Sequence, residues 1–214
     1  MTVSGKVVRA PAGVIGFDLN SKINGAKAKQ FYANGYRFCL RYVGRTDHHA
    51  ANDLTEDEAK VIVDAGLALM VVQHYSGKGW VPTPDLGSDY GQHAASNASE
   101  AGIPDGVSVF LDLEGIKSGT PPTDIIAYCN NWFAAVETGG YVPGVYVGAN
   151  AILSGDELYW DLKTTHYWKS GSTVPDIPHR GYQMVQTIKA GQIDRNVTKD
   201  DSFGNAVLWL TKDA

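Results

Sequence analysis

The chain contains few cysteines and no long apolar run. Only 2 of its 214 residues are cysteine, Cys39 in a strand-like run and Cys129 in a helical pattern, and neither belongs to a Cys-x-x-Cys pair. We therefore expect two buried free thiols and no disulfide. No stretch approaches the ~18 apolar residues that a membrane span needs, and residues 1–13 lack the apolar segment of a Sec-type signal. We expect no membrane partner.

Basic clusters and the common cofactor motifs are also missing. The net charge is −5, and no Lys/Arg cluster is available to neutralise a phosphate backbone, which argues against nucleic acid as a partner. His48 and His49 are adjacent and do not readily converge on one ion, and neither His-Glu-x-x-His nor His-x-His occurs. Because no Gly-x-Gly-x-x-Gly or phosphate-binding loop is present, we expect neither a metal nor another cofactor.

Apolar strand-like runs alternate with helical patterns over most of the chain. The predicted strands cover residues 14–20, 38–44, 67–75, 107–115 and 144–149, and the helices after them cover residues 25–34, 55–66, 89–101, 121–138 and 152–162. Three further strands, at residues 166–170, 182–188 and 192–197, have no full helix between them. A glycine-rich loop at residues 76–87 carries Trp80.

The order of these elements predicts an α/β fold. Strands that alternate with helices favour a parallel sheet with right-handed crossovers, closed into a barrel. Only Lys189, Ala190 and Gly191 separate the last two strands, so these must form a hairpin, since a parallel pair needs a longer crossover. We predict a single irregular TIM-like barrel of about five β/α units followed by about three strands without full helices. One domain would cover residues 1–214, with its core at about 14–210.

Two acids lie at the end of the fourth predicted strand. Because side chains on a strand alternate, Asp112 and Glu114 point to the same side, while Leu111 and Leu113 point to the other. Ionised carboxylates are rarely tolerated at the end of a buried strand without partners. The pair is therefore either a salt-bridged structural feature or a catalytic one.

Polar residues end several other predicted strands. Catalytic groups of such barrels lie at the carboxyl ends of the strands, so we expect many of these side chains to converge on one cup. The candidates are Asp18, Arg41, Tyr42, Gln73, His74, Tyr75, Asp112, Glu114, Tyr146, Tyr167, Trp168, Gln183, Gln186, Asp194 and Asn196. Trp80, Tyr75 and Trp168 are candidates for stacking on sugar rings, with core packing as the alternative for each.

Taken together, these fragments resemble those of the Chalaropsis-type lysozymes, and more closely the bacterial and phage branch of glycoside-hydrolase-like domains of unknown function. The fragments are Gly16-Phe17-Asp18-Leu19-Asn20, His74-Tyr75, Leu111-Asp112-Leu113-Glu114, Gly144-Val145-Tyr146-Val147-Gly148, and Gln186 followed by Ile193-Asp194-Arg195-Asn196-Val197. The resemblance implies an irregular barrel that cleaves the β-1,4 bond between N-acetylmuramic acid and N-acetylglucosamine in peptidoglycan.

The resemblance also implies roles for individual residues. Glu114 would be the general acid, Asp112 would stabilise the reacting centre, and Asp18 and Asp194 would be flanking carboxylates. Tyr146, Tyr75, Trp80, Gln186, Trp168 and His74 would contact the substrate. Typical lysozymes of this type have an Asp where this chain has Thr198, which leaves open whether Asp194 fills that role.

The chemistry of glycoside hydrolysis fits an acid pair. It needs one protonated carboxyl as proton donor and one charged carboxylate near the transition state, and repulsion between Asp112 and Glu114 raises one pKa. Acids this close on one strand are poorly placed to act from opposite sides of a sugar, which favours a substrate-assisted mechanism with the N-acetyl oxygen as nucleophile. A chitinase-type Asp-x-x-Asp-x-Asp-x-Glu motif is not met, because Val107 and Phe110 occupy its two upstream acidic positions.

Three functions therefore remain open. The first is a peptidoglycan hydrolase, the second a barrel that binds cell-wall glycan without cutting it, and the third a glycosidase acting on another N-acetylated polysaccharide. We expect a monomer whose partners are peptidoglycan strands, with an immunity protein or a secretion apparatus as further candidates. With no Sec-type signal, the protein would be made in the cytoplasm and reach the wall through phage lysis or dedicated secretion.

Overall fold

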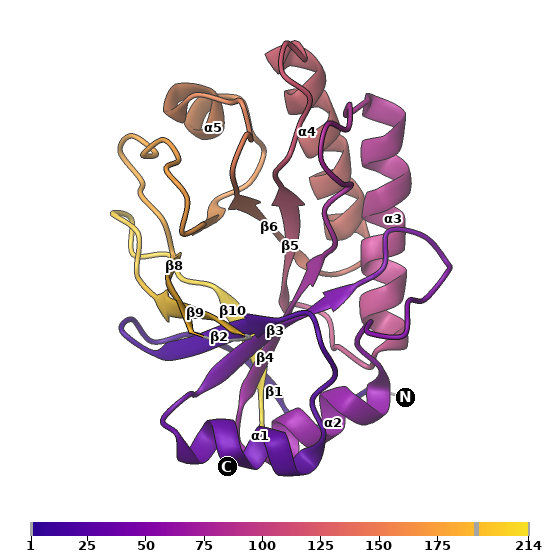
Figure 1. The fold of residues 1–214 in the computed structure, drawn as a ribbon, viewed down its shortest axis with the longest axis vertical. Helices are drawn as coiled ribbons and strands as arrows, with labels where there is room; N and C mark the ends of the chain where they lie inside the picture. The colour runs from indigo at the N-terminus through magenta and orange to yellow at the C-terminus, as the bar shows by residue number, and fades with distance from the viewer. Residues whose placement is uncertain (1, 191–192, 214) are drawn as a thin grey trace.

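Eight strands close into a mixed barrel in the computed structural model, which describes residues 2–190 and 193–213 (Figure 1). The barrel strands are β2 (Ile15–Leu19), β3 (Phe38–Val43), β4 (Ala68–Gln73), β5 (Ser108–Leu113), β6 (Val142–Val147), β7 (His166–Lys169), β8 (Met184–Ala190) and β9 (Ile193–Thr198). Neighbouring strands from β2 to β8 are parallel, and β9 is antiparallel to both β8 and β2. The irregular barrel expected from the sequence is confirmed.

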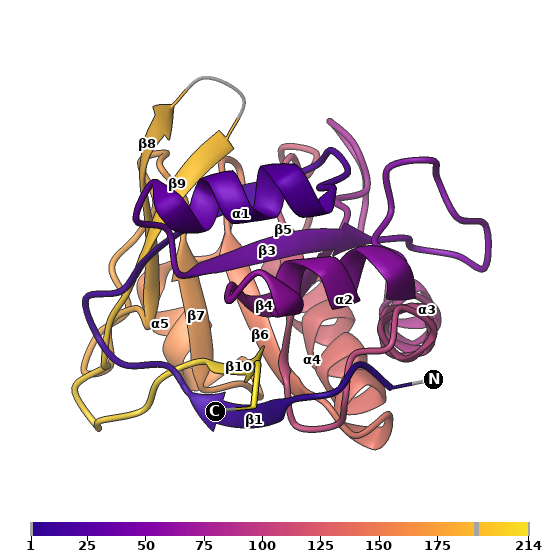
Figure 2. The ribbon, with the colours of Figure 1, turned by 90° about the horizontal axis from the view of Figure 1, so that it is seen from below.

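Each of the first five barrel strands is followed by a helix. The helices are α1 (Gly25–Ala33), α2 (Glu56–Asp64), α3 (Pro84–Glu100), α4 (Pro122–Thr138) and α5 (Gly155–Trp160). Among the described residues, no helix separates β7 from β8 or β8 from β9, as predicted. Helices α1 and α2 pack side by side on one flank of the barrel, and α3 packs along α4 on another (Figures 1 and 2).

The last two strands of the barrel form the expected antiparallel hairpin. Residues 191 and 192, part of the predicted connector and the predicted start of the last strand, lie outside the described residues. The described part of β9 begins at Ile193, and its antiparallel direction brings this first residue to the carboxyl ends of the parallel strands.

Two short strands that the sequence pattern did not predict cover the amino ends of β3, β4 and β5. β1 (Lys6–Arg9) pairs antiparallel with β10 (Leu208–Thr211). Strand β10 joins the barrel through the Leu210–Leu69 pair, and the ring of Trp209 packs on Phe38, with 5.4 Å between centroids. Figure 2 shows β1 and β10 at the bottom of the view, while the strands β8 and β9 reach its top.

Two helices begin at other residues than predicted. Helix α3 begins at Pro84 instead of residue 89, because Thr83 caps it by accepting a hydrogen bond from the Leu86 amide and Pro84 occupies the first turn. The loop predicted at residues 76–87 is therefore shorter. Helix α5 begins at Gly155 instead of residue 152, because Ser154 and Glu157 form a capping box there.

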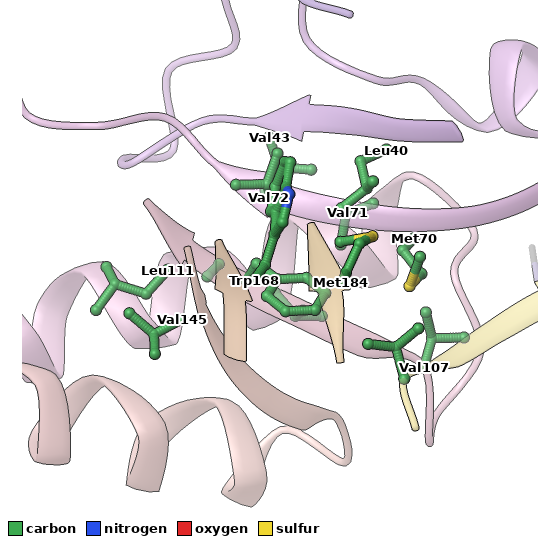
Figure 3. Close-up of a cluster of buried hydrophobic side chains, with 14 of the residues drawn as sticks. Leu40, Val43, Met70, Val71, Val72, Val107, Leu111, Val145, Trp168 and Met184 are labelled. Carbon is green, nitrogen blue, oxygen red and sulfur yellow. The ribbon is translucent and has the colours of Figure 1, made fainter. Parts of the chain in front are cut away.

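The barrel interior is filled by large apolar side chains. Trp168 is 1% exposed and lies beside Met184 of β8 (Figure 3), and its ring packs edge-on against Phe110 with 5.7 Å between centroids. Both cysteines are buried free thiols, as expected. No helix within residues 2–190 and 193–213 has the length and apolar character of a membrane span.

Candidate active site

Asp18 lies inside the carboxyl end of the barrel. Its neighbour Phe17 packs outward on Phe31 of α1, with 4.2 Å between ring centroids, so alternation along β2 turns Asp18 inward. Three side chains donate hydrogen bonds to its carboxylate: Tyr42 at 3.2 Å, Gln186 at 3.0 Å and Asn196 at 2.7 Å. Asp18 is therefore held in a fixed orientation by groups from three other strands.

The environment of Asp18 favours its protonated form. Burial raises its pKa to about 6, and the charge of Asp194 acts in the same direction, against the three hydrogen bonds. Asp194 is the cross-strand partner of Asp18 on β9, so the two carboxylates belong to the same end of the barrel. Proximity to Asp194 is one reason why Asp18 titrates near neutral pH.

Asp112 is buried, as Asp18 is. It is 6% exposed, and its Oδ1 has no hydrogen-bond partner among the described residues. Burial, followed by the charges of Glu114 and Asp18, raises its pKa well above the usual range. No cation in the described part of the chain forms an ion pair with Asp112 or Glu114, which contradicts the salt-bridged alternative.

Glu114 directly follows β5 and is half-buried. Burial and the charge of Asp18 raise its pKa. A methyl group at Gly148 would lie 2.5 Å from Cβ of Glu114 and 2.7 Å from its Oε2, so only glycine leaves room for this side chain. The indole nitrogen of Trp80 donates a hydrogen bond of 2.8 Å to the Glu114 backbone carbonyl oxygen. Neighbouring loops therefore constrain both the backbone and the side chain of Glu114.

Tyr146 and Gln186 connect this acid cluster to the opposite wall. The Tyr146 hydroxyl donates to Oε1 of Gln186 over 3.2 Å, and the Gln186 amide donates to Asp18. Burial raises the pKa of Tyr146 above its usual value, and the charges of Asp112, Glu114 and Asp18 act in the same direction. The phenol therefore stays a hydrogen-bond donor near neutral pH. The structure thus brings Asp18, Asp112, Glu114, Tyr146 and Gln186 together.

Four further candidates lie at different depths around the cluster. Trp168 is fully buried, packs against Tyr146 with 4.5 Å between ring centroids and donates to Asn196 over 2.8 Å. It fills the barrel below the site, so its prediction as a sugar platform is wrong. Trp80 is partly buried and packs edge-on against Tyr128. Its contact with sugar stays a prediction.

His74 and Tyr75 directly follow β4 and have different surroundings. His74 stacks on Tyr42 with 4.9 Å between ring centroids and pairs with Asp53 over 2.9 Å, so it reaches the cluster only through Tyr42. Tyr75 is 41% exposed and lies close to Gly115, the residue after Glu114. Of the predicted aromatic platforms, Tyr75 has the most accessible ring beside the acids.

Thr198 lies far from this chemistry. Its hydroxyl donates to the Pro11 carbonyl and accepts from the Val14 amide, before the start of β2 at the amino end of the barrel. Asp194, in contrast, lies opposite Asp18 at the carboxyl end. Position 198 is thus structural in this chain, and Asp194 is the β9 carboxylate available to the site.

Three residues that support the site were assigned no role from the sequence, although Tyr42 and Asn196 were among the strand-end residues expected to converge. Tyr42 and Asn196 hold Asp18, and Gly148 makes room for Glu114. Each lies at or near a strand end, which was the available signal, but partners that meet across a barrel cannot be assigned from strand ends alone. Among the described residues, no group of three or more His, Cys, Asp or Glu side chains is arranged to hold a metal ion.

The fold and the acid cluster define a glycoside hydrolase-like barrel. The chain belongs to the Rv2525c-like, glycoside hydrolase-like domain family, whose model matches residues 29–205. This confirms the resemblance drawn from the sequence fragments. No curated protein sequence matches the chain significantly.

Solved structures show the same fold at low sequence identity. The Tat-secreted protein Rv2525c of Mycobacterium tuberculosis is 19% identical, with 91% of this chain and 98% of that chain covered and a TM-score of 0.66. The bacterial lysozyme of Streptomyces coelicolor is 16% identical over 91% and 95% of the two chains, with a TM-score of 0.59. The muramidase of Trichobolus zukalii is 16% identical over 87% and 93%, with a TM-score of 0.60.

Proposed function

We propose that this protein is a peptidoglycan hydrolase that cleaves the β-1,4 bond between N-acetylmuramic acid and N-acetylglucosamine. The observation that carries the proposal is the pair Asp112 and Glu114, which have raised pKa values and no counter-cation among the described residues. Buried, unpaired acids with raised pKa values are costly in a merely structural role and suit proton donation. The lysozyme and muramidase among the similar folds support this reaction class.

Glu114 is the proton donor on this proposal. It is half-buried, so a glycosidic oxygen can reach it, and its raised pKa favours the protonated form more than in an ordinary glutamate. Trp80 holds the backbone of Glu114, and the close approach to Gly148 limits the rotamers of its side chain. This restriction favours proton transfer along one direction.

Asp112 orients the N-acetyl group of the substrate. Its unpartnered Oδ1 is a buried acceptor that lacks a donor, and an acetamido N–H supplies one. Because Asp112 and Glu114 come from the same strand, the N-acetyl oxygen is better placed than a carboxylate to attack the anomeric carbon. Asp18 and Asp194 flank this pair at the same end of the barrel, where Tyr146 donates its hydroxyl to Gln186 and Tyr75 offers an exposed ring.

Digestion of purified peptidoglycan, with mass spectrometry of the released fragments, tests this function. We expect soluble fragments that carry N-acetylmuramic acid at the reducing end. Wall binding without release of fragments would instead identify a non-catalytic glycan-binding barrel. Cleavage of another N-acetylated polymer, with peptidoglycan left intact, would identify a different glycosidase.

A further inference from the structure

A pocket of about 390 Å³ opens beside Gly115, the residue that follows Glu114. Residues 78–79, 115–119, 150 and 152 line it. These residues belong to the loops that follow β4, β5 and β6, so the pocket lies on the same face of the barrel as the acid cluster. Its lining begins with Gly115, the residue directly after Glu114, and a group bound there would be a near neighbour of the reacting sugar.

Backbone hydrogen bonds join the three loops around the pocket. The Gly79 amide donates to the Gly115 carbonyl over 2.6 Å, and the Lys117 amide donates to the Trp80 carbonyl over 2.8 Å. On the other side, the Gly115 amide donates to the Ala149 carbonyl over 2.8 Å. Because each loop is held by its neighbour, the pocket is a pre-formed feature.

Two lysines supply the charge of this pocket. Lys78 and Lys117 are both exposed, and within residues 2–190 and 193–213 neither ammonium group forms an ion pair or a hydrogen bond. They stand out in a chain of net charge −5, next to a site built from carboxylates. Two unpaired cations at one pocket favour an anionic ligand.

The rim of the pocket is also strained. Ile152 has φ 71° and is 38% exposed, and Asn150 has φ 58°. A β-branched residue in the left-handed region is a genuine outlier, and such strain persists mainly where a ligand or a functional loop requires it. Ile152, with the buried Ile116 below it, gives the pocket an apolar wall beside its cations.

We propose that this pocket binds the stem peptide that branches from the sugar beside the scissile bond, with Lys78 and Lys117 contacting its carboxylates. The inference rests on the proposed function and concerns the substrate preference of the same site. The protein would prefer glycan that carries stem peptides to glycan without them. The glycan chain has to pass over Asp112 and Glu114 to be cleaved. A stem peptide that branches from the reacting sugar can extend into the neighbouring pocket. The apolar wall suits the alkyl parts of a peptide better than those of a phosphate polymer.

The test compares two forms of peptidoglycan that has been stripped of phosphodiester polymers: one with its stem peptides and one after an amidase has removed them. The double variant Lys78→Ala/Lys117→Ala should lower kcat/KM on peptide-bearing strands by about fivefold and leave cleavage of bare strands unchanged. The loss should shrink at high salt, because exposed charges are screened. The matched control is Lys29→Ala/Lys60→Ala, two exposed lysines on α1 and α2.

Co-sedimentation of each form with the protein gives a second readout that does not depend on cleavage. Peptide-bearing strands should bind more tightly than bare strands to the parent, and the double variant should lose this difference. Equal effects of the double variant on both strands, or an effect seen only with walls that keep their phosphodiester polymers, would overturn the inference. Absence of cleavage with the binding difference intact would count against the proposed hydrolysis alone.

Discussion

The indole nitrogen of Trp80 lies 2.8 Å from the backbone carbonyl oxygen of Glu114 and donates a hydrogen bond to it. Trp80 also packs edge-on against Tyr128, with 5.0 Å between ring centroids, and its own carbonyl accepts from the Lys117 amide. The loop after β4 thus fixes the backbone position of Glu114, the acid that follows β5. Trp80 is a positioning residue for Glu114, whatever contact its ring makes with sugar.

Trp80→Phe separates these two contributions. Phenylalanine keeps a ring against Tyr128 but removes the donor to Glu114, so we expect stability to fall by only about 1 kcal/mol, the net value of one hydrogen bond. Turnover should fall more, by up to about 10², because a small displacement of a catalytic group is costly. Lysis rate, glycan binding and melting temperature are measured on the same preparation.

The matched control is Trp160→Phe, the same change at a tryptophan that is 68% exposed. It should alter none of the three quantities. Loss of glycan binding in Trp80→Phe, with turnover of bound substrate unchanged, would mean that Trp80 acts as a sugar platform and not through Glu114.

Gly148→Ala should inactivate the site while the barrel stays folded. The added methyl group would lie 2.5 Å from Cβ of Glu114 and 2.9 Å from Cε1 of Tyr146, so one of these side chains must move. We expect a drop in turnover of at least about tenfold, since both groups flank the reacting centre. Circular dichroism and wall lysis report fold and activity separately. Gly171→Ala is the control, because its methyl group meets only Gln186, at an ordinary 3.5 Å.

The titration of Asp18 predicts an unusual dependence of stability on pH. Its pKa is raised from 3.8 to about 6, so the folded state binds this proton more tightly than the unfolded state does. Its contribution to stability is therefore complete below about pH 4 and is lost as the pH rises through 6. Two pKa units correspond to about 3 kcal/mol. The pKa values of Asp112 and Glu114 are also raised, so these two acids likewise stabilise the fold less as the pH rises.

Chemical denaturation of the parent and of Asp18→Asn between pH 4 and pH 7.5 isolates this contribution. As the pH rises over this range, the unfolding free energy of the parent should fall by about 3 kcal/mol relative to that of Asp18→Asn. Parallel curves would show that Asp18 titrates normally.

The elements that could be predicted from the sequence are those with a local signature. The five β/α units follow from apolar periodicity, and the final hairpin follows from a connector too short for a parallel pair. Strands β1 and β10 could not be predicted, because each is only 4 residues long and pairs with a distant part of the chain. Their stability comes from contacts such as that of Trp209 with Phe38, which no local pattern encodes.

The acids of the site could also be predicted, but their surroundings could not. Alternation put Asp112 and Glu114 on one side of a strand that proved to be buried throughout. The same rule cannot tell how far a side chain lies from the rim, and Trp168, also at a strand end, proved to fill the interior. The partners of Asp18 come from three other strands and become visible only once the barrel is closed.

Glu114→Gln tests the central assignment. Glutamine keeps the shape of the side chain but cannot deliver a proton, so catalysis should fall by ~10²–10⁴ while glycan affinity stays close to that of the parent. The change also removes a charge that raises the pKa of Asp112, and no cation among the described residues pairs with Glu114. The variant should therefore be at least as stable as the parent near neutral pH.

Wall-lysis rate and melting temperature of Glu114→Gln are compared with those of Glu137→Gln, the same change at an exposed residue of α4. The control should match the parent in both. An unchanged lysis rate in Glu114→Gln would remove Glu114 from the mechanism. A marked fall in its melting temperature would instead mean that the carboxylate stabilises the fold, because a buried acid relieved of repulsion should not cost stability when it is neutralised.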